Sequence, residues 1–327
     1  MPLTPSNGDR LHGPFTRLYR RVDEALWRHL ATFLAMGRGF GRAWLVEVML
    51  RRLRFQSGIM RIVDDAAQQA PGLAETAVTR AWRDGAREAR ADTGSRREHF
   101  DARAVRTILG RVQDAIDGMH RHIPVHAGRV YRTVATEAAH DSDEQSRRTR
   151  ALHALRRFAR QGFTGLIDPR GRRRELVTYA EQTIRGAVSA AEVDGYCQQA
   201  VADGFDLFIV SDVPGACELC RPHEGRIYSI TGSTVGAISR DTITGTPIRV
   251  NVAGSLADAR TDGLFHYGCR HTIRVWTPDD PVPPRAVRAT PEQRAARRAA
   301  THAARQQRTQ RRIAIVQSVL GRRNSRP

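Results

Sequence analysis

Four residues in the last third of the chain have the types and spacing of a metal site. Cys217 and Cys220 form a Cys-x2-Cys pair, and His266 and Cys269 form a His-x2-Cys pair after 45 intervening residues. A Cys-x2-Cys turn brings two thiolates to the same side, and a second pair from a distant loop can complete a tetrahedral shell. His271 is the alternative to His266. The spacing therefore predicts a zinc site.

The predicted zinc is structural, because four protein ligands leave no open coordination position for a substrate or a water. With both histidines available, one of them could stay free, which keeps a catalytic site open as an alternative. His223, three residues after Cys220, is a weaker candidate ligand. The remaining cysteine, Cys197, lies in a helical pattern and is expected to be a buried thiol.

Short strands and one long helix are expected to position these ligands. The apolar run Leu207–Val210 precedes the cysteine pair and has the length and composition of a buried strand. Residues 227–230 and 272–276 are two further strands, and the Thr-, Gly- and Ser-rich residues 231–262 between them predict a long loop or an inserted hairpin. Residues 162–171 predict a turn-rich strand or hairpin, and residues 174–203 predict a long helix.

The first 160 residues predict helices joined by short breaks. Apolar residues recur every three or four positions from Phe15 onward, and the glycine-rich residues 36–41 interrupt the pattern. Pro71 is expected to start a new helix, Pro124 to interrupt one, and residues 141–144 to supply an acidic helix start. The fold class expected is α+β and predominantly helical. In it, an N-terminal helical region is followed by a long helix, a small zinc-stabilised β module and a basic helical tail.

The charge of the chain is concentrated in its tail. The formal net charge is +19, and all 53 basic residues are arginine. Residues 281–327 hold twelve of these arginines and a single acidic residue, Glu292. Such a tail favours phosphate contacts with nucleic acid, although a basic extension without a defined role fits the pattern equally well. The candidate nucleic-acid-binding residues are Arg294, Arg297, Arg298, Arg305, Arg308, Arg311 and Arg312.

Membrane association is not expected. No stretch approaches the roughly 18 apolar residues of a membrane span. The first residues also lack the basic and apolar regions of a secretory signal, so we expect synthesis in the cytoplasm.

Several segments resemble the phage minor capsid protein 2 family, which is similar to the Mu F-type head morphogenesis proteins. The resemblance covers residues 160–276 and is carried by GFDLFIVSD at 204–212, CELCRPHEGRIYS at 217–229, SLADA at 255–259 and HYGCRH at 266–271, with weaker matches at 162–172 and 179–185. The sequence departs from the family in having Tyr267-Gly268 where Pro-Asn is expected, and His223 where tryptophan is expected. The second departure indicates that His223 is a substitution and not a ligand.

The resemblance implies a structural virion protein without enzymatic activity. It implies a low-copy component inside the phage head near the portal, with a role in head assembly or in handling packaged DNA. The expected partners are the portal or major capsid protein and packaged DNA bound without sequence preference; neither a membrane nor a small-molecule substrate is expected.

The expected domain organisation is linear. It comprises a flexible leader (1–14), a helical domain (15–160), a minor capsid domain with the zinc module (161–280) and an Arg-rich C-terminal tail (281–327).

Two other functions remain open from the sequence. A metal-dependent nuclease or toxin-like effector would need an open metal site and a general base, for which Asp212, Glu218 and Glu224 are near in sequence. A free DNA-binding regulator is the other, but the long insertion between the ligand pairs differs from the compact spacing of recognition fingers. Incorporation into phage particles separates both from the capsid function.

Overall fold

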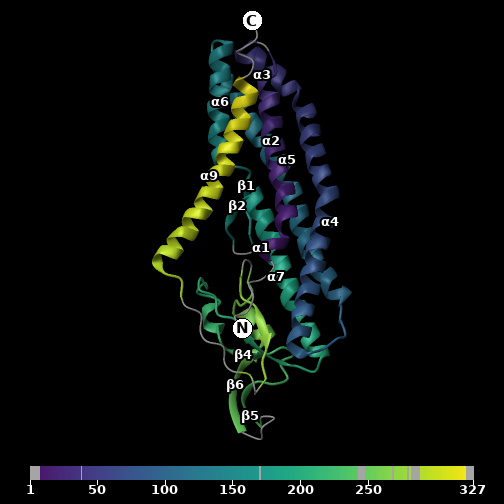
Figure 1. Cartoon of the computed structure of the whole chain (residues 1–327). Helices are drawn as coiled ribbons and strands as arrows, with labels where there is room; N and C mark the ends of the chain where they lie inside the picture. Colours follow the sequence, from purple (N-terminus) through teal and green to yellow (C-terminus); the bar gives the residue numbers. More distant parts are fainter. Residues whose placement is uncertain are drawn as a thin grey trace. The chain divides into compact units, whose positions relative to one another are not determined.

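The computed structural model describes residues 8–37, 39–168, 171–241, 247–266, 269–277, 280 and 288–321 (Figure 1). Helices account for most of these residues, and two small β-sheets complete the regular structure. The fold class predicted from the sequence, α+β and predominantly helical, is therefore confirmed. No helix among the described residues combines the length and the apolar character needed to cross a membrane.

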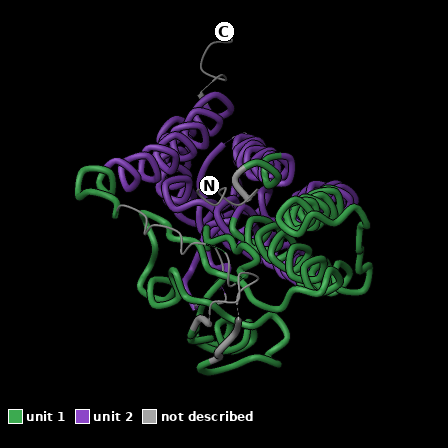
Figure 2. Tube along the Cα trace, turned by 60° about the horizontal axis from the view of Figure 1, so that its bottom comes forward, with its two compact units in different colours: residues 1–13, 73–112, 182–295 green, residues 14–72, 113–181, 296–327 purple. Residues whose placement is uncertain are grey.

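The chain divides into two compact units, each assembled from segments that are distant in sequence (Figure 2). The first unit comprises residues 1–13, 73–112 and 182–295, and the second comprises 14–72, 113–181 and 296–327. The linear domain boundaries expected from the sequence stay a prediction. Most of the expected leader, residues 1–7, lies outside the described residues, and Gly8–Leu11 form the short helix α1.

The second unit is built mainly from helices. They are α2 (Gly13–Ala35), α3 (Gly41–Leu50), the first part of α4 (Arg52–Thr93), the second part of α5 (Ala102–Ala138), α6 (Glu144–Gln161) and most of α9 (Pro291–Gly321). Aromatic side chains fill the interior: the rings of Phe55 and Tyr131 stack 4.2 Å apart, and the Tyr131 hydroxyl donates to the carbonyl oxygen of Val48. The predicted hairpin is present as the antiparallel strands β1 (Thr164–Ile167) and β2 (Arg173–Glu175).

Two helix boundaries expected from proline are wrong. Pro71 lies inside α4 and Pro124 inside α5, and both helices continue through them. A proline removes one backbone hydrogen bond, which a helix tolerates when the residues around it are held by packing. Ala70 and Ala74 around Pro71, and Ile123 and Ala127 around Pro124, are almost fully buried. The acidic start of α6 is confirmed, since the Asp143 side chain accepts a hydrogen bond from the backbone N–H of Ser146.

The first unit contains a mixed five-stranded sheet. Its strands are β3 (Leu207–Val210), β4 (Ile227–Ser229), β5 (Gly236–Asp241), β6 (Pro247–Ser255) and β7 (Ile273–Val275), in the order β5-β6-β4-β3-β7. The three strands expected from the sequence, β3, β4 and β7, lie at one side, and the antiparallel pair β5–β6 is the inserted hairpin. Only β4 and β6 pair in parallel. We call residues 207–276, which contain this sheet and its loops, the metal module.

The long helix α7 (Leu176–Ala202) supports the metal module. Apolar side chains of its last turns share a core with Phe208 and Val210 of β3 and with Ile273 and Val275 of β7. Tyr196 of α7 also links α4 to β7. Its hydroxyl donates to Asp92 Oδ2 of α4 at 2.5 Å and accepts from the N–H of Val275 in β7 at 2.7 Å. The sheet is thus fixed on a rigid helix.

Two glycines allow α4 and α7 to approach closely in the first unit. A Cβ added at Gly195 would lie 2.3 Å from the carbonyl oxygen of Trp82, and one added at Gly85 would lie 2.0 Å from that of Glu192. Real Cβ atoms do not approach backbone oxygens so closely, so any side chain here would push the helices apart.

We expect Gly195→Ala to destabilise the protein, because the new methyl group can be accommodated only by moving the backbone of α4. Overpacking of this kind costs about 1–3 kcal/mol. The matched control is Gly110→Ala in α5, where an added Cβ meets nothing within 4 Å. That change should stabilise the helix by up to about 1 kcal/mol. Urea unfolding of both variants measures the difference, and equal midpoints would contradict the close helix contact.

The expected helical tail is confirmed as α9. Thr290 caps it: the Thr290 hydroxyl accepts from the N–H of Gln293, and the Gln293 side chain accepts from the N–H of Thr290. Residues 291–307 are exposed on every side, whereas Arg312, Val316 and Leu320 are buried in the second unit. Residues 281–287 and 322–327 of the expected tail lie outside the described residues.

Candidate metal centre

The Cys-x2-Cys pair lies on a tight turn between β3 and β4. The N–H of Arg221 donates to the carbonyl oxygen of Cys217 at 3.0 Å, and a short 3-10 helix, Arg221–His223, follows directly. Cys217 is exposed, whereas Cys220 is buried at 1% exposure. The turn therefore presents one thiol at the surface and one toward the interior of the module.

The second group of ligands lies between α8 (Leu256–Thr261) and β7. The N–H of Cys269 donates to the carbonyl oxygen of His266 at 2.8 Å. Tyr267 and Gly268, where the family has Pro-Asn, lie outside the described residues. Cys269 and His271 are buried, and His266 is half-buried. This loop thus carries its three candidate ligands at different depths.

The five ligand atoms form two overlapping groups of three, within which all atoms lie within 4.8 Å of one another. One group is Cys217, Cys220 and His266, and the other is Cys220, Cys269 and His271. The Sγ atoms of Cys220 and Cys269 are 3.5 Å apart, close to the about 3.8 Å expected for two thiolates on one tetrahedral zinc. The Cys217 Sγ lies 2.9 Å from His266 Nε2. The residues expected to bind metal are therefore brought together by the fold.

The buried thiol pair is arranged to carry negative charge. The hydrogen bond from Cys220 and the contacts with His271 lower the pKa of Cys269 against the effect of burial. The same hydrogen bond, together with burial, raises the pKa of Cys220. One thiolate at neutral pH makes the pair an attractive site for a cation, and a bound metal would displace the second proton.

His271 is held by a network of polar contacts behind the ligand atoms. Its Nδ1 faces the Cys269 Sγ at 3.2 Å, and its Nε2 lies 3.0 Å from Glu224 Oε1. Glu224 also accepts hydrogen bonds from the N–H of Val213 at 2.8 Å and from Arg288 at 2.5 Å. A carboxylate on the outer nitrogen of a histidine fixes the ring and its tautomer, as in many zinc sites. Because its oxygens are engaged in this way, Glu224 is poorly suited to act as a general base.

His223 and Cys197 have roles apart from the ligand atoms. The Nδ1 of buried His223 lies 2.7 Å from the Tyr228 hydroxyl. Burial lowers the pKa of His223, so the ring is neutral and has a structural role. Cys197 is buried in the core shared by α7 and the sheet, and burial raises the pKa of its thiol.

Sequence reasoning missed Arg288 as part of this centre. Arg288 was assigned to the basic tail, but it forms an ion pair with Glu224, and the N–H of Ala289 donates to the carbonyl oxygen of Pro214 at 2.7 Å. These contacts attach the segment before α9 to the cysteine loop. Nothing in the local sequence distinguishes Arg288 from the other tail arginines, so no pattern could have identified it.

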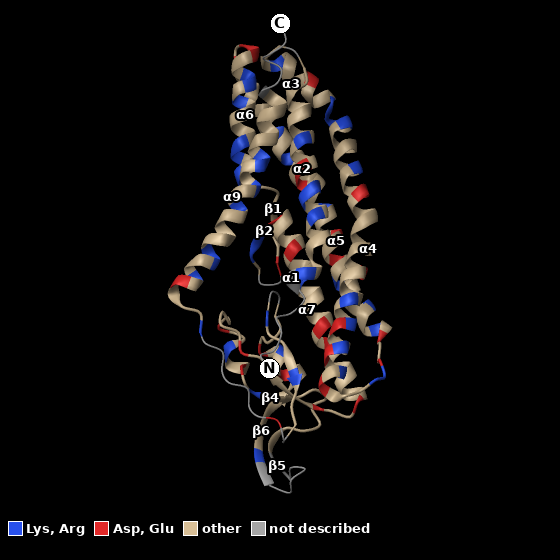
Figure 3. Cartoon of the chain, in the orientation of Figure 1, with Lys and Arg blue, Asp and Glu red and all other residues tan. Residues whose placement is uncertain are grey.

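The tail arginines fall into two classes by their contacts. Arg312 is 1% exposed and donates to Asp23 at 2.6 Å and to Glu175 at 2.9 Å, while Arg308 pairs with Glu175 at 2.6 Å. These two guanidinium groups are engaged in the packing of α9 in the second unit. Arg311 is exposed and lies 3.8 Å from Glu24. The exposed part of α9, along which Figure 3 shows several basic positions, carries the four remaining candidates: Arg294, Arg297, Arg298 and Arg305.

A model of one protein family matches the chain over residues 45–318, and the description of that family is phage minor capsid protein 2. The chain belongs to the phage minor capsid protein 2 family. The match begins in α3 and ends in α9, so it extends well beyond the segments 160–276 on which the resemblance rested. No curated protein and no solved structure matches the chain.

Membership of the family establishes the general role of the chain. It is a phage structural protein and a component of the virion, and its family is non-enzymatic. As a capsid family, it is expected to interact with other proteins of the phage head.

Proposed function

We propose that the chain is a low-copy minor capsid protein located inside the phage head near the portal vertex. The observation that carries this proposal is the family match over residues 45–318. Its partners are the portal protein, the major capsid protein or both, together with packaged DNA. The exposed arginines of α9 support the contact with DNA, because arginine–phosphate contacts are strong and independent of sequence.

The proposed location can be tested on intact particles. Protease added to intact, purified particles should leave the chain uncut, whereas protease added after osmotic shock should cleave it at its many arginines. Cleavage in intact particles would place it outside the head. Neighbours in the head can be identified by cross-linking, with reagents for carboxyl groups because the chain has no lysine amines.

We further propose that the metal module binds one structural zinc through three thiolates and one histidine. The thiolates are those of Cys217, Cys220 and Cys269, which belong to the two overlapping groups of ligand atoms. Four sulfur and nitrogen donors, as in a tetrahedral site, favour zinc over hard cations. A fully coordinated zinc is structural, so the module needs no substrate and no catalytic role.

Of the two histidines, we propose His271 as the fourth ligand. A carboxylate can only accept, so the Glu224 contact makes Nε2 of His271 a donor and leaves Nδ1 as the nitrogen that can bind a metal. Nδ1 lies 3.2 Å from Cys269 Sγ, and once it has lost its proton its lone pair would be directed at the thiol pair. His266, beside Cys217, is the other candidate, and His266→Ala and His271→Ala distinguish the two: His271→Ala should release the zinc, and His266→Ala should retain it.

Glu224→Gln should weaken zinc binding about 10–100-fold without changing the number of zinc ions bound. The substitution keeps the size of the side chain but removes the charge that orients His271 and pairs with Arg288. Competition with a chromophoric chelator measures the affinity. The control is Glu218→Gln, an exposed acid inside the Cys-x2-Cys turn with the same change of charge. Equal affinities of the two variants would show that His271 does not bind the metal.

A further inference from the structure

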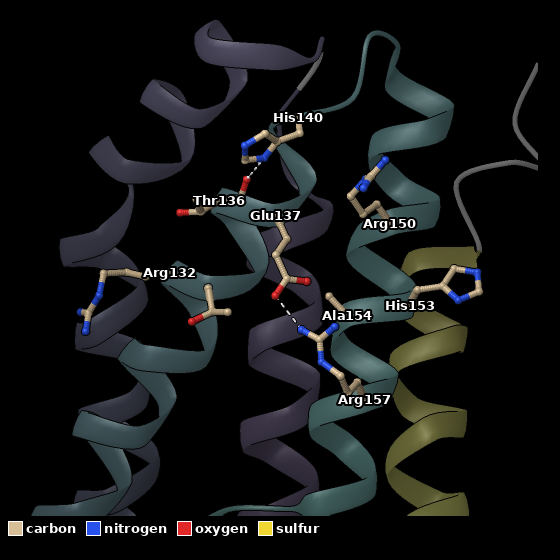
Figure 4. A pocket seen from close by; sticks show the side chains of 9 residues that line it. Arg132, Thr136, Glu137, His140, Arg150, His153, Ala154 and Arg157 are labelled. Atoms are coloured by element: carbon tan, nitrogen blue, oxygen red, sulfur yellow. Dashed lines mark hydrogen bonds and ion pairs between the residues drawn. The ribbon is translucent and has the colours of Figure 1, made fainter.

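A polar hollow lies between the last third of α5 and the middle of α6, both in the second unit (Figure 4). It is a cavity of about 600 Å³. Arg132 and Glu137 line it from α5, His140 from the turn after α5, and Arg150, His153 and Arg157 from α6. Three guanidinium groups and two imidazoles thus line the hollow, with Arg157 directed toward Glu137 and with Arg132 and His153 extending to opposite sides (Figure 4).

Two of the three arginines have acidic partners, but both pairs are partly exposed. Arg157 lies 2.6 Å from Glu137, and Arg150 makes two hydrogen bonds of 2.7 Å to Asp141. The arginine side chains of these pairs are 54% and 53% exposed. Solvent-exposed pairs of this kind stabilise a protein little, and each guanidinium keeps further N–H donors for a ligand.

The remaining basic groups of the hollow are uncompensated. Within the described part of the chain, neither Arg132 nor His153 forms an ion pair, and both are exposed. His140 donates from Nδ1 to the carbonyl oxygen of Thr136 at 2.9 Å. The hollow therefore has more positive than negative groups and several unused hydrogen-bond donors.

We propose that this hollow binds phosphate groups of the DNA backbone. Guanidinium groups match the geometry of phosphate oxygens and bind them in pairs of hydrogen bonds. Most of the lining side chains are exposed, and Ala154 is the one apolar residue among them, so the surface suits a charged polymer more than an enclosed small molecule. The proposal rests on the proposed contact with packaged DNA and adds a second site to the exposed part of α9.

The test measures binding of the full chain to a fluorescent 20-base-pair duplex by anisotropy over a series of KCl concentrations. Arg132→Gln/Arg157→Gln should weaken binding about tenfold or more. Each phosphate contact removed should also reduce the slope of log K against log salt by about 0.9. The matched control is Arg52→Gln/Arg54→Gln, which removes the same charge from exposed positions of α4 outside the hollow. Circular dichroism checks that both variants keep their helices.

A tail variant and two competing ligands distinguish the hollow from the tail as the DNA-binding site, and phosphate from other anions as its ligand. Arg297→Gln/Arg298→Gln tests the exposed part of α9: if it weakens binding and the hollow variant behaves like its control, the hollow proposal fails and the tail contact stands. If the unmodified chain binds no duplex, the proposed contact with DNA fails as a whole. Inorganic phosphate and polyglutamate are added as competitors. Displacement of the duplex from the hollow by polyglutamate at equal charge concentration would overturn the assignment to phosphate in favour of an acidic protein segment.

Discussion

Removal of the proposed zinc will lower the midpoint of thermal unfolding of the first unit by about 10 °C or more. A ligand present at about 1,000 times its dissociation constant stabilises the folded state by about 4.1 kcal/mol. For a unit of this size, each kcal/mol shifts the midpoint by roughly 2–4 °C. Hydrogen exchange should accelerate in the loops 213–224 and 262–272, whose ends the metal holds together. The strands β3 and β7 should be less affected, because they share a core with α7.

The variant that tests this prediction is Cys220→Ser, which removes the thiol common to both groups of ligand atoms. It should bind no zinc and match the chelated protein in stability. Cys197→Ala is the control, because it deletes a buried thiol of the same unit that lies in the apolar core and not among the ligands. A chelated protein that keeps its midpoint, or a Cys220→Ser protein that keeps its zinc, would show that the cluster is not a structural metal site.

Arg312→Met will destabilise the protein by about 3–5 kcal/mol, because it leaves charged partners buried without compensation. Asp23 is 3% exposed; burial raises its pKa, and the contact with Arg312 opposes that rise. Methionine fills much of the volume of arginine but supplies no donor to Asp23 or Glu175. Urea unfolding measures the loss, and a free energy of unfolding within about 0.5 kcal/mol of the original chain would contradict the buried network.

Two further variants show whether the loss comes from the buried charge. Asp23→Asn combined with Arg312→Met should recover part of the stability, since the uncompensated carboxylate is gone. Arg311→Ala, at the next position of α9, removes an exposed arginine whose nearest acid, Glu24, is 3.8 Å away. Its cost should lie between about 0 and 1 kcal/mol. A similar loss for Arg311→Ala and Arg312→Met would mean that α9 is held by something other than this network.

Local sequence patterns predicted helices and strands correctly where tertiary packing favours the same structure as the pattern. The buried strand at Leu207–Val210 and the helical tail after Thr290 follow directly from an apolar run and a capping sequence, and the structure confirms them. The strand or hairpin expected at 162–171 is a hairpin whose second strand extends to Glu175. Proline misled the prediction at Pro71 and Pro124 because the rule for helix breaking describes an isolated helix. In α4 and α5, burial of the neighbouring residues outweighs the lost hydrogen bond.

The sequence predicted which residues could bind the metal, but not the contacts that orient them. Spacing alone identified the cysteines and both histidines, and the fold brings them together in two groups. The orientation of His271 depends on Glu224 and Arg288, which come from two other loops, so only the tertiary structure could reveal it. The same reason applies to the burial of Arg312: its charge is visible in the sequence, but its acidic partner Asp23 is 289 residues away.

The most direct test of the capsid function is mass spectrometry of nuclease-treated, density-purified phage particles, with this chain counted against the major shell protein. The proposed function predicts between a few and some tens of copies in each particle. Absence of the chain from particles, together with its abundance in the producing cell, would contradict a virion role and would require an activity outside the head.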